Sequence, residues 1–237
     1  MIATLRRLLL VSAGAIALSA SGLAQVSTDI SKVMAQAEAA HERADYAEAI
    51  RWFRLAADQG FAKAQTNLGA MYDLGQGVPQ NYAEALRWYR LAADQGNAVA
   101  QYNVGVMYGA GRGVPQNDTE AIRWLRLAAA QGDAKAQFNL GIAYVNRLGV
   151  PQNDTEALRW FRLAAAQDDA EAQFSLGVMY VKGQGVPQND VEAYKWWSLA
   201  SAQGHGSAAK NRDIVRARMT PAQIAEGQRL ASAWKPK

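Results

Sequence analysis

The sequence repeats itself with a period of 36 residues, and this period limits the possible folds more than any other feature of the chain. The pentapeptide GVPQN begins at four evenly spaced positions, Gly77, Gly113, Gly149 and Gly185. Four complete units follow one another and share 16 identical columns out of 36: 61–96, 97–132, 133–168 and 169–204. A catalytic loop is needed once in a chain, whereas a joint between equivalent blocks is needed in each block. We therefore expect stacked units that contact their neighbours.

Each unit has the pattern of two helices joined by the GVPQN turn. The first helix is predicted over 62–74, because Ala64, Leu68 and Tyr72 form an apolar face at helical spacing. Gly69 lies in its middle and costs about 1 kcal/mol relative to alanine. Equivalent glycines recur in all four units, so we expect a neighbouring helix to approach closely at this point.

The GVPQN turn is expected to end the first helix and to cap the second. Gly77 permits a positive φ, and Pro79 prevents the first helix from continuing. Asn81 follows, and its side chain can accept a hydrogen bond from the first turn of the second helix. Because Glu84 stands three residues later, the spacing predicts a capping box.

The second helix is amphipathic, and its buried stripe is predicted to contain Ala85, Trp88, the residue after Trp88, and Ala92. Five tryptophans share one column of the repeat: Trp52, Trp88, Trp124, Trp160 and Trp196. A stacking platform for sugars or bases is one interpretation, but the helical period places them in the core. At the end of the second helix the third unit has Asp168 in place of glycine, and we expect a left-handed aspartate there.

Arginines form two columns on the exposed side of the second helices: Arg51, Arg87, Arg123 and Arg159, with Arg54, Arg90, Arg126 and Arg162. The adjacent Glu84 column partly neutralises them, so a solvated face with intrahelical ion pairs is favoured over a nucleic-acid site.

Charge is uneven along the chain. Residues 25–204 hold 16 Lys or Arg against 19 Asp or Glu, and residues 205–237 hold 7 against 2. We interpret the basic tail as a solvated pair of terminal helices, the alternative being a site for an acidic partner or anionic lipid.

The first 24 residues have the layout of a secretory signal peptide. Arg6 and Arg7 precede an apolar run of about 13 residues, which is short for a membrane span. Small residues follow, and cleavage is predicted after Ala24, the alternative being an uncleaved signal anchor. The mature protein is thus expected to be periplasmic or secreted and not to span a membrane. Because the chain has no cysteine, it can form neither a disulfide nor a thiolate metal site.

Degenerate units are predicted at both ends of the repeat region, as capping helix pairs over 25–60 and 205–237. At the C-terminal end, Thr220, Pro221 and Gln223 provide an N-cap, a proline at the first helical position and a capping-box partner. They predict a final helix that reaches Trp234.

The pattern AQxxLGxxYxxGxGVPQN…EAxxWxxxAAxQG over 61–204 resembles the Sel-one-like repeat, a short relative of the tetratricopeptide repeat. This resemblance implies a single-domain, all-α, right-handed solenoid of antiparallel helix pairs. It also implies a non-enzymatic adaptor or scaffold that binds another protein and needs no cofactor. Exported bacterial members include regulators of envelope signalling and factors that touch host cells.

In related repeats the first helix of each pair lines the concave surface, and columns that vary between units are free to contact a partner there. Three such columns hold the candidate partner-binding residues: Thr66, Tyr102, Phe138 and Phe174; Ala70, Val106, Ile142 and Val178; and Lys63, Val99, Lys135 and Glu171. One aromatic or aliphatic side chain per unit would suit an extended peptide or an amphipathic helix. The alternative is that these side chains pack against the neighbouring unit. Solvent exposure separates the two interpretations.

Sequence motifs for catalysis are missing from the chain. His41 and His205 fall in different caps without a partner motif, and GQGVPQN follows a helix and lacks the lysine of a phosphate loop. Three hypotheses follow: an exported scaffold that holds an envelope protein in its concave groove, an enzyme or small-molecule binder acting on cell-wall material, and a secreted factor whose partner lies outside the producing cell. We favour the scaffold.

Overall fold

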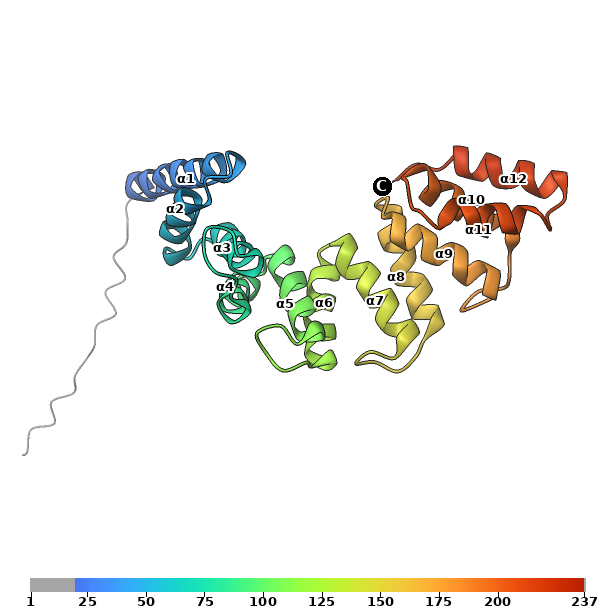
Figure 1. The fold of residues 1–237 in the computed structure, drawn as a ribbon, viewed down its shortest axis with the longest axis horizontal. Coiled ribbons are helices and arrows are strands. Elements are labelled where there is room, and N and C mark those ends of the chain that lie inside the picture. Colours follow the sequence, from blue (N-terminus) through green and yellow to red (C-terminus); the bar gives the residue numbers. More distant parts are fainter. Residues whose placement is uncertain (1–19, 237) are drawn as a thin grey trace, which may run out of the picture.

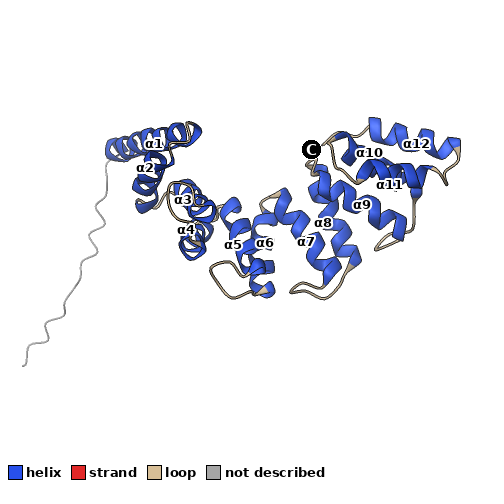
Figure 2. Ribbon diagram, viewed as in Figure 1, coloured by secondary structure: helices blue, strands red, loops and turns tan. Residues whose placement is uncertain are grey.

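A computed structural model describes residues 20–236, and twelve α-helices account for most of them (Figures 1 and 2). The helices are α1 (Ala20–Glu42), α2 (Tyr46–Asp58), α3 (Ala62–Leu74), α4 (Tyr82–Asp94), α5 (Ala98–Ala110), α6 (Asp118–Ala130), α7 (Ala134–Asn146), α8 (Asp154–Ala166), α9 (Ala170–Lys182), α10 (Asp190–Ala202), α11 (Ala208–Arg216) and α12 (Pro221–Ser232). No strand occurs within 20–236. The predicted all-α repeat solenoid is confirmed.

Successive helices pack against one another from α1 to α10, and both α11 and α12 pack on α10. Figure 1 shows that the resulting helix pairs follow an open arc, with α1 and α2 at one end and α10 to α12 at the other. In the N-terminal part, α1 and α3 lie on the inner side of the arc, above α2 and α4. Residues 1–19 of the predicted signal peptide lie outside the described residues.

Close approach within each helix pair explains the glycine in the middle of the first helix. A Cβ atom at Gly69 would lie 2.8 Å from the ring of Tyr89, and one at Gly141 would lie 2.4 Å from the ring of Phe161. Such distances are well inside van der Waals contact, so the side chain after the repeated tryptophan occupies this space. The expected close approach is confirmed.

The GVPQN turn follows the end of the first helix, which it was predicted to cause, and it also touches the preceding unit. Helix α3 ends at Leu74 and is capped by Gly75 in the left-handed region, two residues before Gly77, which has a φ of 73°. A Cβ atom at Gly77 would lie 2.6 Å from the carbonyl oxygen of Tyr46, in the first turn of α2. The glycine is therefore required by its φ and by the neighbouring backbone. The sequence predicted the first requirement only.

Capping of the second helices differs from the prediction in one respect. The Asn81 side chain accepts a hydrogen bond from the Glu84 amide at 3.1 Å, as expected. The Asn81 amide, however, donates to the Tyr72 carbonyl at 2.9 Å, while the Glu84 carboxylate bonds to Arg87. The capping box at this position is thus only half formed, because α3 supplies the acceptor that the glutamate was expected to provide.

Helix α12 does have a complete capping box. The Thr220 hydroxyl accepts from the Gln223 amide, and the Gln223 side chain accepts from the Thr220 amide. The helix ends at Ser232, slightly before the predicted Trp234. The Trp234 ring then lies edge-on to Trp196 with 4.9 Å between ring centroids. It therefore covers the last member of the tryptophan column.

Tryptophans of the repeat column belong to the core, as predicted. Trp88, Trp124 and Trp196 are buried, and Trp52 and Trp160 are half-buried. The preceding arginine stacks on three of these rings, with its guanidinium carbon 4.1 Å from the ring centre in the case of Arg87 on Trp88. The expected intrahelical pairs are also present: Arg87 with Glu84, Arg123 with Glu120 and Arg159 with Glu156, each at 3.1 Å.

A row of buried glutamines connects the units, and sequence reasoning did not find it. Its members are Gln65, Gln101, Gln137 and Gln173, all at most 5% exposed. In the third unit, the Gln137 amide donates to the Ala129 carbonyl of the preceding unit at 3.3 Å. The Gln137 side-chain oxygen accepts from Gln167 at 2.9 Å. We call these four residues the glutamine row.

Three described residues other than glycine have a positive φ, Ala44, Arg147 and Asp168, and the last two lie in complete units. Asp168 has a φ of 67°, as predicted, and its carboxylate accepts hydrogen bonds from Gln173 at 2.8 Å and Gln203 at 3.1 Å. Arg147 has a φ of 62° at the end of α7, where the other three complete units have glycine. The left-handed conformation strains the backbone of Asp168. The hydrogen bond from Gln173 offsets part of this strain and joins Asp168 to the glutamine row.

Candidate functional site

One side of the first helices forms a continuous surface along the solenoid. In α3 it consists of positions 63, 67, 70 and 74, which are spaced to lie on one helical face and are at least partly exposed. Equivalent positions recur 36 residues apart in α5, α7 and α9. They continue into α11, where Asn211 and Ile214 stand 36 residues after Ser175 and Val178. We call this surface the first-helix face.

The middle of the first-helix face contains a pocket of about 290 Å³ between α5 and α7, with α6 as its floor. Val106 and Ile142 line it from the two first helices, together with Asn139. Ile122 and Leu125 contribute from α6. The lining is mainly apolar, so this pocket can accept an aliphatic or aromatic side chain.

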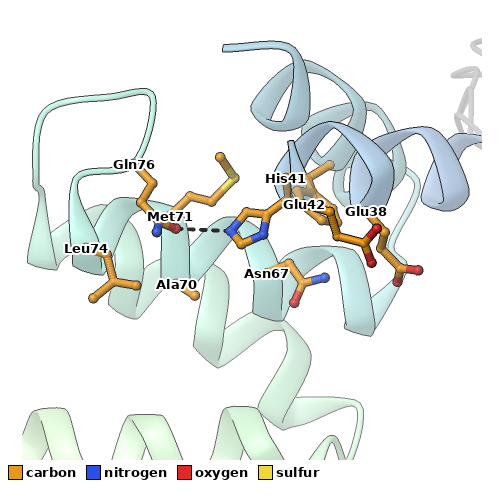
Figure 3. A pocket seen from close by; sticks show the side chains of 9 residues that line it. Glu38, His41, Glu42, Asn67, Ala70, Met71, Leu74 and Gln76 are labelled. Carbon is orange, nitrogen blue, oxygen red and sulfur yellow. Dashed lines mark hydrogen bonds between the residues drawn. The ribbon is translucent and has the colours of Figure 1, made fainter. Parts of the chain in front are cut away.

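A second pocket, of about 340 Å³, lies at the N-terminal end of the same face, between α1 and α3. Figure 3 shows Glu38 and Glu42 at one end of it and Leu74 at the other, with Asn67 and Ala70 between them. His41 also points into the space, and its Nε2 atom lies 3.2 Å from the side-chain oxygen of Gln76. This pocket has an apolar wall and two carboxylates at its rim.

Both pockets occur at equivalent places in the repeat. Each is lined by three residues of the later unit: Asn67, Ala70 and Met71 in the N-terminal pocket, and Asn139, Ile142 and Ala143 in the middle one. The residue that follows the repeated tryptophan, Phe53 or Leu125, forms part of each floor. The pockets are thus a consequence of how two successive units meet. They differ in charge because the earlier units supply different side chains.

The predicted aromatic column is more buried than a ligand-binding surface requires, and Thr66 does not belong among the candidate partner-binding residues. Thr66 is 8% exposed, and its hydroxyl donates to the Ala62 carbonyl at 2.8 Å. It does not line the groove. Tyr102, Phe138 and Phe174 are half-buried and pack against core clusters.

The two phenylalanines use much of their surface to pack against neighbouring elements, which supports the alternative interpretation of this column. The Phe138 ring lies 5.7 Å from the Phe161 ring within its own unit. The Phe174 ring is stacked on His205 of the following segment, with 4.2 Å between centroids. Burial raises the pKa of the Tyr102 hydroxyl, and Asp133 raises it further, while a hydrogen bond with Asn139 lowers it. Whether these rings also contact a partner stays a prediction.

Aliphatic and charged columns lie closer to solvent. Val106 and Ile142 line the middle pocket, Ala70 lines the N-terminal one, and Val178 is half-buried. In the charged column, Val99 is 53% exposed and Lys135 is also exposed.

The other two members of the charged column pair with residues outside their own helix. Lys63 pairs with Glu38 of α1 at 2.6 Å. The Glu171 carboxylate lies 3.4 Å from His205 Nε2. Both interactions join one unit to a neighbouring one at the edge of the first-helix face.

A row of amides on the first-helix face was missed by the sequence analysis. Asn67, Asn103, Asn139 and Asn211 are half-buried, and Ser175 takes the remaining place. Three of the four complete units share this asparagine, whereas the sequence analysis sought partner-binding residues in columns that vary between units. The asparagine column could have been found from its spacing. It stands four residues after the charged column and three before the aliphatic one, so it lies on the face that was predicted to be exposed.

Within the described part of the chain, no group of three or more histidine, cysteine, aspartate or glutamate side chains is arranged to hold a metal ion. None of the helices over 20–236 is long and apolar enough to cross a bilayer.

Tandem helix pairs with one recurring exposed face define an α-solenoid of the tetratricopeptide class. Within that class, the Sel1 repeat matches residues 40–61, 62–97, 98–133, 134–169 and 170–205, and the chain belongs to the Sel1 repeat family. The first, shorter match lies in the predicted N-terminal capping pair, which is therefore partly a truncated repeat. Sel1 repeat proteins generally mediate protein–protein interactions and act as non-enzymatic scaffolds.

Solved structures resemble the chain over most of its length. A Sel1 repeat protein from Oxalobacter formigenes is 30% identical, with a TM-score of 0.74, covering 84% of this chain and 82% of its own. The protective antigen c5321 of uropathogenic Escherichia coli is 36% identical, with a TM-score of 0.73 over 78% of this chain. This chain spans only 40% of that antigen's length.

An immunity protein, Pa5087 from Pseudomonas aeruginosa, shares the fold at 24% identity, with a TM-score of 0.50 over 83% of this chain and 78% of its own. No curated protein matches the chain at a significant level.

Proposed function

We propose that this protein is a non-enzymatic scaffold of the bacterial envelope that binds a protein partner along its first-helix face. The observation that supports this most directly is the middle pocket, where Val106 and Ile142 are only half-buried and face the space between α5 and α7. Apolar side chains that a monomer leaves accessible in a lined pocket are typical anchor points for a partner's side chain. The Sel1 repeat family supports a protein as the partner.

Export is the second part of the proposal. It rests on the layout of residues 1–24, which is that of a signal peptide with cleavage after Ala24. Fusion of the whole chain to alkaline phosphatase, which is active only beyond the inner membrane, tests it. We expect an active fusion, and N-terminal sequencing should begin at Gln25. An inactive fusion with an intact N-terminus would place the protein inside the cell.

Site-specific photo-cross-linking in living cells tests the binding surface. A photoreactive residue at Val99, which is 53% exposed on the first-helix face, is compared with one at Leu163, which is 40% exposed on a second helix. We expect a discrete adduct with another protein from position 99 only. The adduct should weaken when Ile142→Asp places a charge in the neighbouring pocket.

Equal adducts from both positions, or adducts that survive Ile142→Asp, would contradict the proposal. Phe138 is a poorer probe position than Val99, because its ring packs on Phe161 and its replacement would change stability and binding together. Circular dichroism of the Ile142→Asp variant separates loss of binding from loss of helix.

A further inference from the structure

The two ends of the first-helix face carry opposite charge. At the N-terminal end, Glu38 and Glu42 stand at the rim of the pocket between α1 and α3. Glu38 is paired with Lys63, whereas Glu42 is exposed and has no cationic partner among the described residues. The N-terminal end therefore keeps an uncompensated negative charge beside an apolar wall.

At the C-terminal end, two lysines lie on or beside the same face. Lys182 occupies the position equivalent to Leu74. Lys210 lies outside the four positions that define the face: it stands one turn before Ile214, in the column of Thr66, which is buried in α3 but exposed in α11. Both are exposed, and neither is within ion-pair distance of a carboxylate in the described part of the chain. Arg218 is already held by Asp190 at 2.7 Å, so the two lysines provide the free positive charge.

Between these ends the first-helix face is mainly apolar. Its aliphatic column contains Val106, Ile142 and Val178, and Ile214 extends the column into α11, where 59% of its side chain is exposed. Two charges interrupt this region, Lys135 and Glu171, and the second is placed beside His205. The face thus has a free carboxylate at α1, a mainly apolar middle, and free lysines at α9 and α11.

We propose that the first-helix face binds a charge-polarised protein segment, with basic residues at the end near α1, apolar residues in the middle and acidic residues at the end near α11. This inference rests on the proposed function and adds the chemistry and the orientation of the partner. Complementary charges at the two ends favour one placement of the segment, because the reversed placement puts like charges together at both ends. The apolar middle contributes affinity in either placement.

The size of the segment follows from the repeat. Helices that pack directly lie about 10 Å apart. Successive first helices pack through the second helix between them, so the five steps from α1 to α11 span at least about 50 Å. An extended chain advances about 3.3 Å per residue, so at least roughly 15 residues are needed to cover the face.

Two synthetic peptides of one composition test the proposal against the full-length chain. The polarised peptide has two lysines at one end, alternating isoleucine and serine in the middle and two glutamates at the other end. The symmetric isomer has one lysine and one glutamate at each end. We expect the polarised peptide to bind about tenfold more tightly at low salt, and the difference to shrink at high salt because exposed charges are screened.

Orientation is measured by placing a photoreactive residue beside either end of the polarised peptide. The lysine end should cross-link to α1 or α3, and the glutamate end to α9 or α11. A variant with exchanged charges, Glu38→Lys and Glu42→Lys with Lys182→Glu and Lys210→Glu, should exchange the two cross-linking patterns.

A matched control exchanges four exposed charges on the second helices. It combines Arg51→Glu and Arg90→Glu with Asp58→Lys and Asp94→Lys, and it should leave affinity and cross-links unchanged. Circular dichroism verifies that each variant keeps its helix content. If the fourfold variant does not fold, Glu42→Lys with Lys210→Glu replaces it, because both side chains are exposed and unpaired in the structure.

Equal affinity for both isomers, or cross-links to the same helices from both peptide ends, would overturn the polarity and leave groove binding intact. If neither isomer cross-links to a first helix, the inference and the proposed function both fail for this class of partner. Exchange of the patterns by the first variant and not by the control supports the inference.

Discussion

The glutamine row gives the sharpest test of how the units are held together, and Gln137→Leu is the perturbation of choice. The side chain of Gln137 is 5% exposed and makes two hydrogen bonds, to the Ala129 carbonyl at 3.3 Å and from Gln167 at 2.9 Å. Leucine has a similar size, so the substitution removes the hydrogen bonds and leaves no large cavity.

The expected magnitude follows from what happens to the two former partners. Each lost hydrogen bond costs about 1 kcal/mol net. The Ala129 carbonyl keeps its bond from the Gly132 amide at 3.0 Å, and the exposed Gln167 amide can turn to water, so neither group is left buried without a partner. Burial of leucine offsets part of the loss. We expect the free energy of unfolding to fall by about 1 to 2 kcal/mol, which corresponds to a midpoint about 2 to 8 °C lower in a chain of this size.

Urea and thermal unfolding followed by circular dichroism provide the measurement. Gln188→Leu is the matched control, because this exposed glutamine of the last GVPQN turn makes no side-chain hydrogen bond in the described structure; its substitution should change stability by less than about 0.5 kcal/mol. A Gln137→Leu variant as stable as the parent would refute the reasoning that the row stabilises the contact between units. A variant that unfolds in two separated steps would show that the row maintains cooperativity between repeats.

Three further predictions concern backbone strain and titration. Arg147→Gly should stabilise the protein by about 1 kcal/mol, because Arg147 has a φ of 62° where glycine is unstrained; a lower thermal midpoint would contradict this. Gly149→Ala should destabilise it by more than about 2 kcal/mol in urea unfolding, because the new Cβ would lie 2.5 Å from the Asp118 carbonyl oxygen at a positive φ. Burial, and to a smaller extent Asp73, raise the pKa of Tyr89. Above about pH 10 the unfolded state therefore loses a proton that the folded state retains, so stability should fall with rising pH, and less steeply in Tyr89→Phe.

Much of the architecture could be predicted because each unit repeats the same local signals. Helix α3 begins and ends where the spacing of Ala64, Leu68 and Tyr72 placed it, and Asn81 caps the next helix as expected. Asp168 takes the left-handed conformation that its position demanded. These features depend on residues close together in the chain, so sequence spacing is sufficient to find them.

Contacts between units were harder to predict. The role of Gln137 depends on a carbonyl in the preceding helix pair and on an amide at the end of its own, and nothing in the spacing indicates that either is within reach. The capping box at Glu84 failed for the same reason, since the Tyr72 carbonyl takes the hydrogen bond. Thr66 occupies a variable column and is nevertheless buried. A column can vary between repeats because its residues are exposed or because the core accommodates different side chains, so variability alone does not predict exposure.

The sequence by itself determined that this chain is a stack of helical hairpins, where each hairpin turns, and which tryptophans enter the core, because helical period and turn chemistry are local properties. Only the tertiary structure decided which variable residues reach solvent, that a buried row of amides joins the units, and that acidic and basic side chains lie at opposite ends of one face. Those properties arise from contacts between different helices, whose residues stand from 8 to 36 or more positions apart in the chain, and a repeat fixes that geometry only after its units have been stacked.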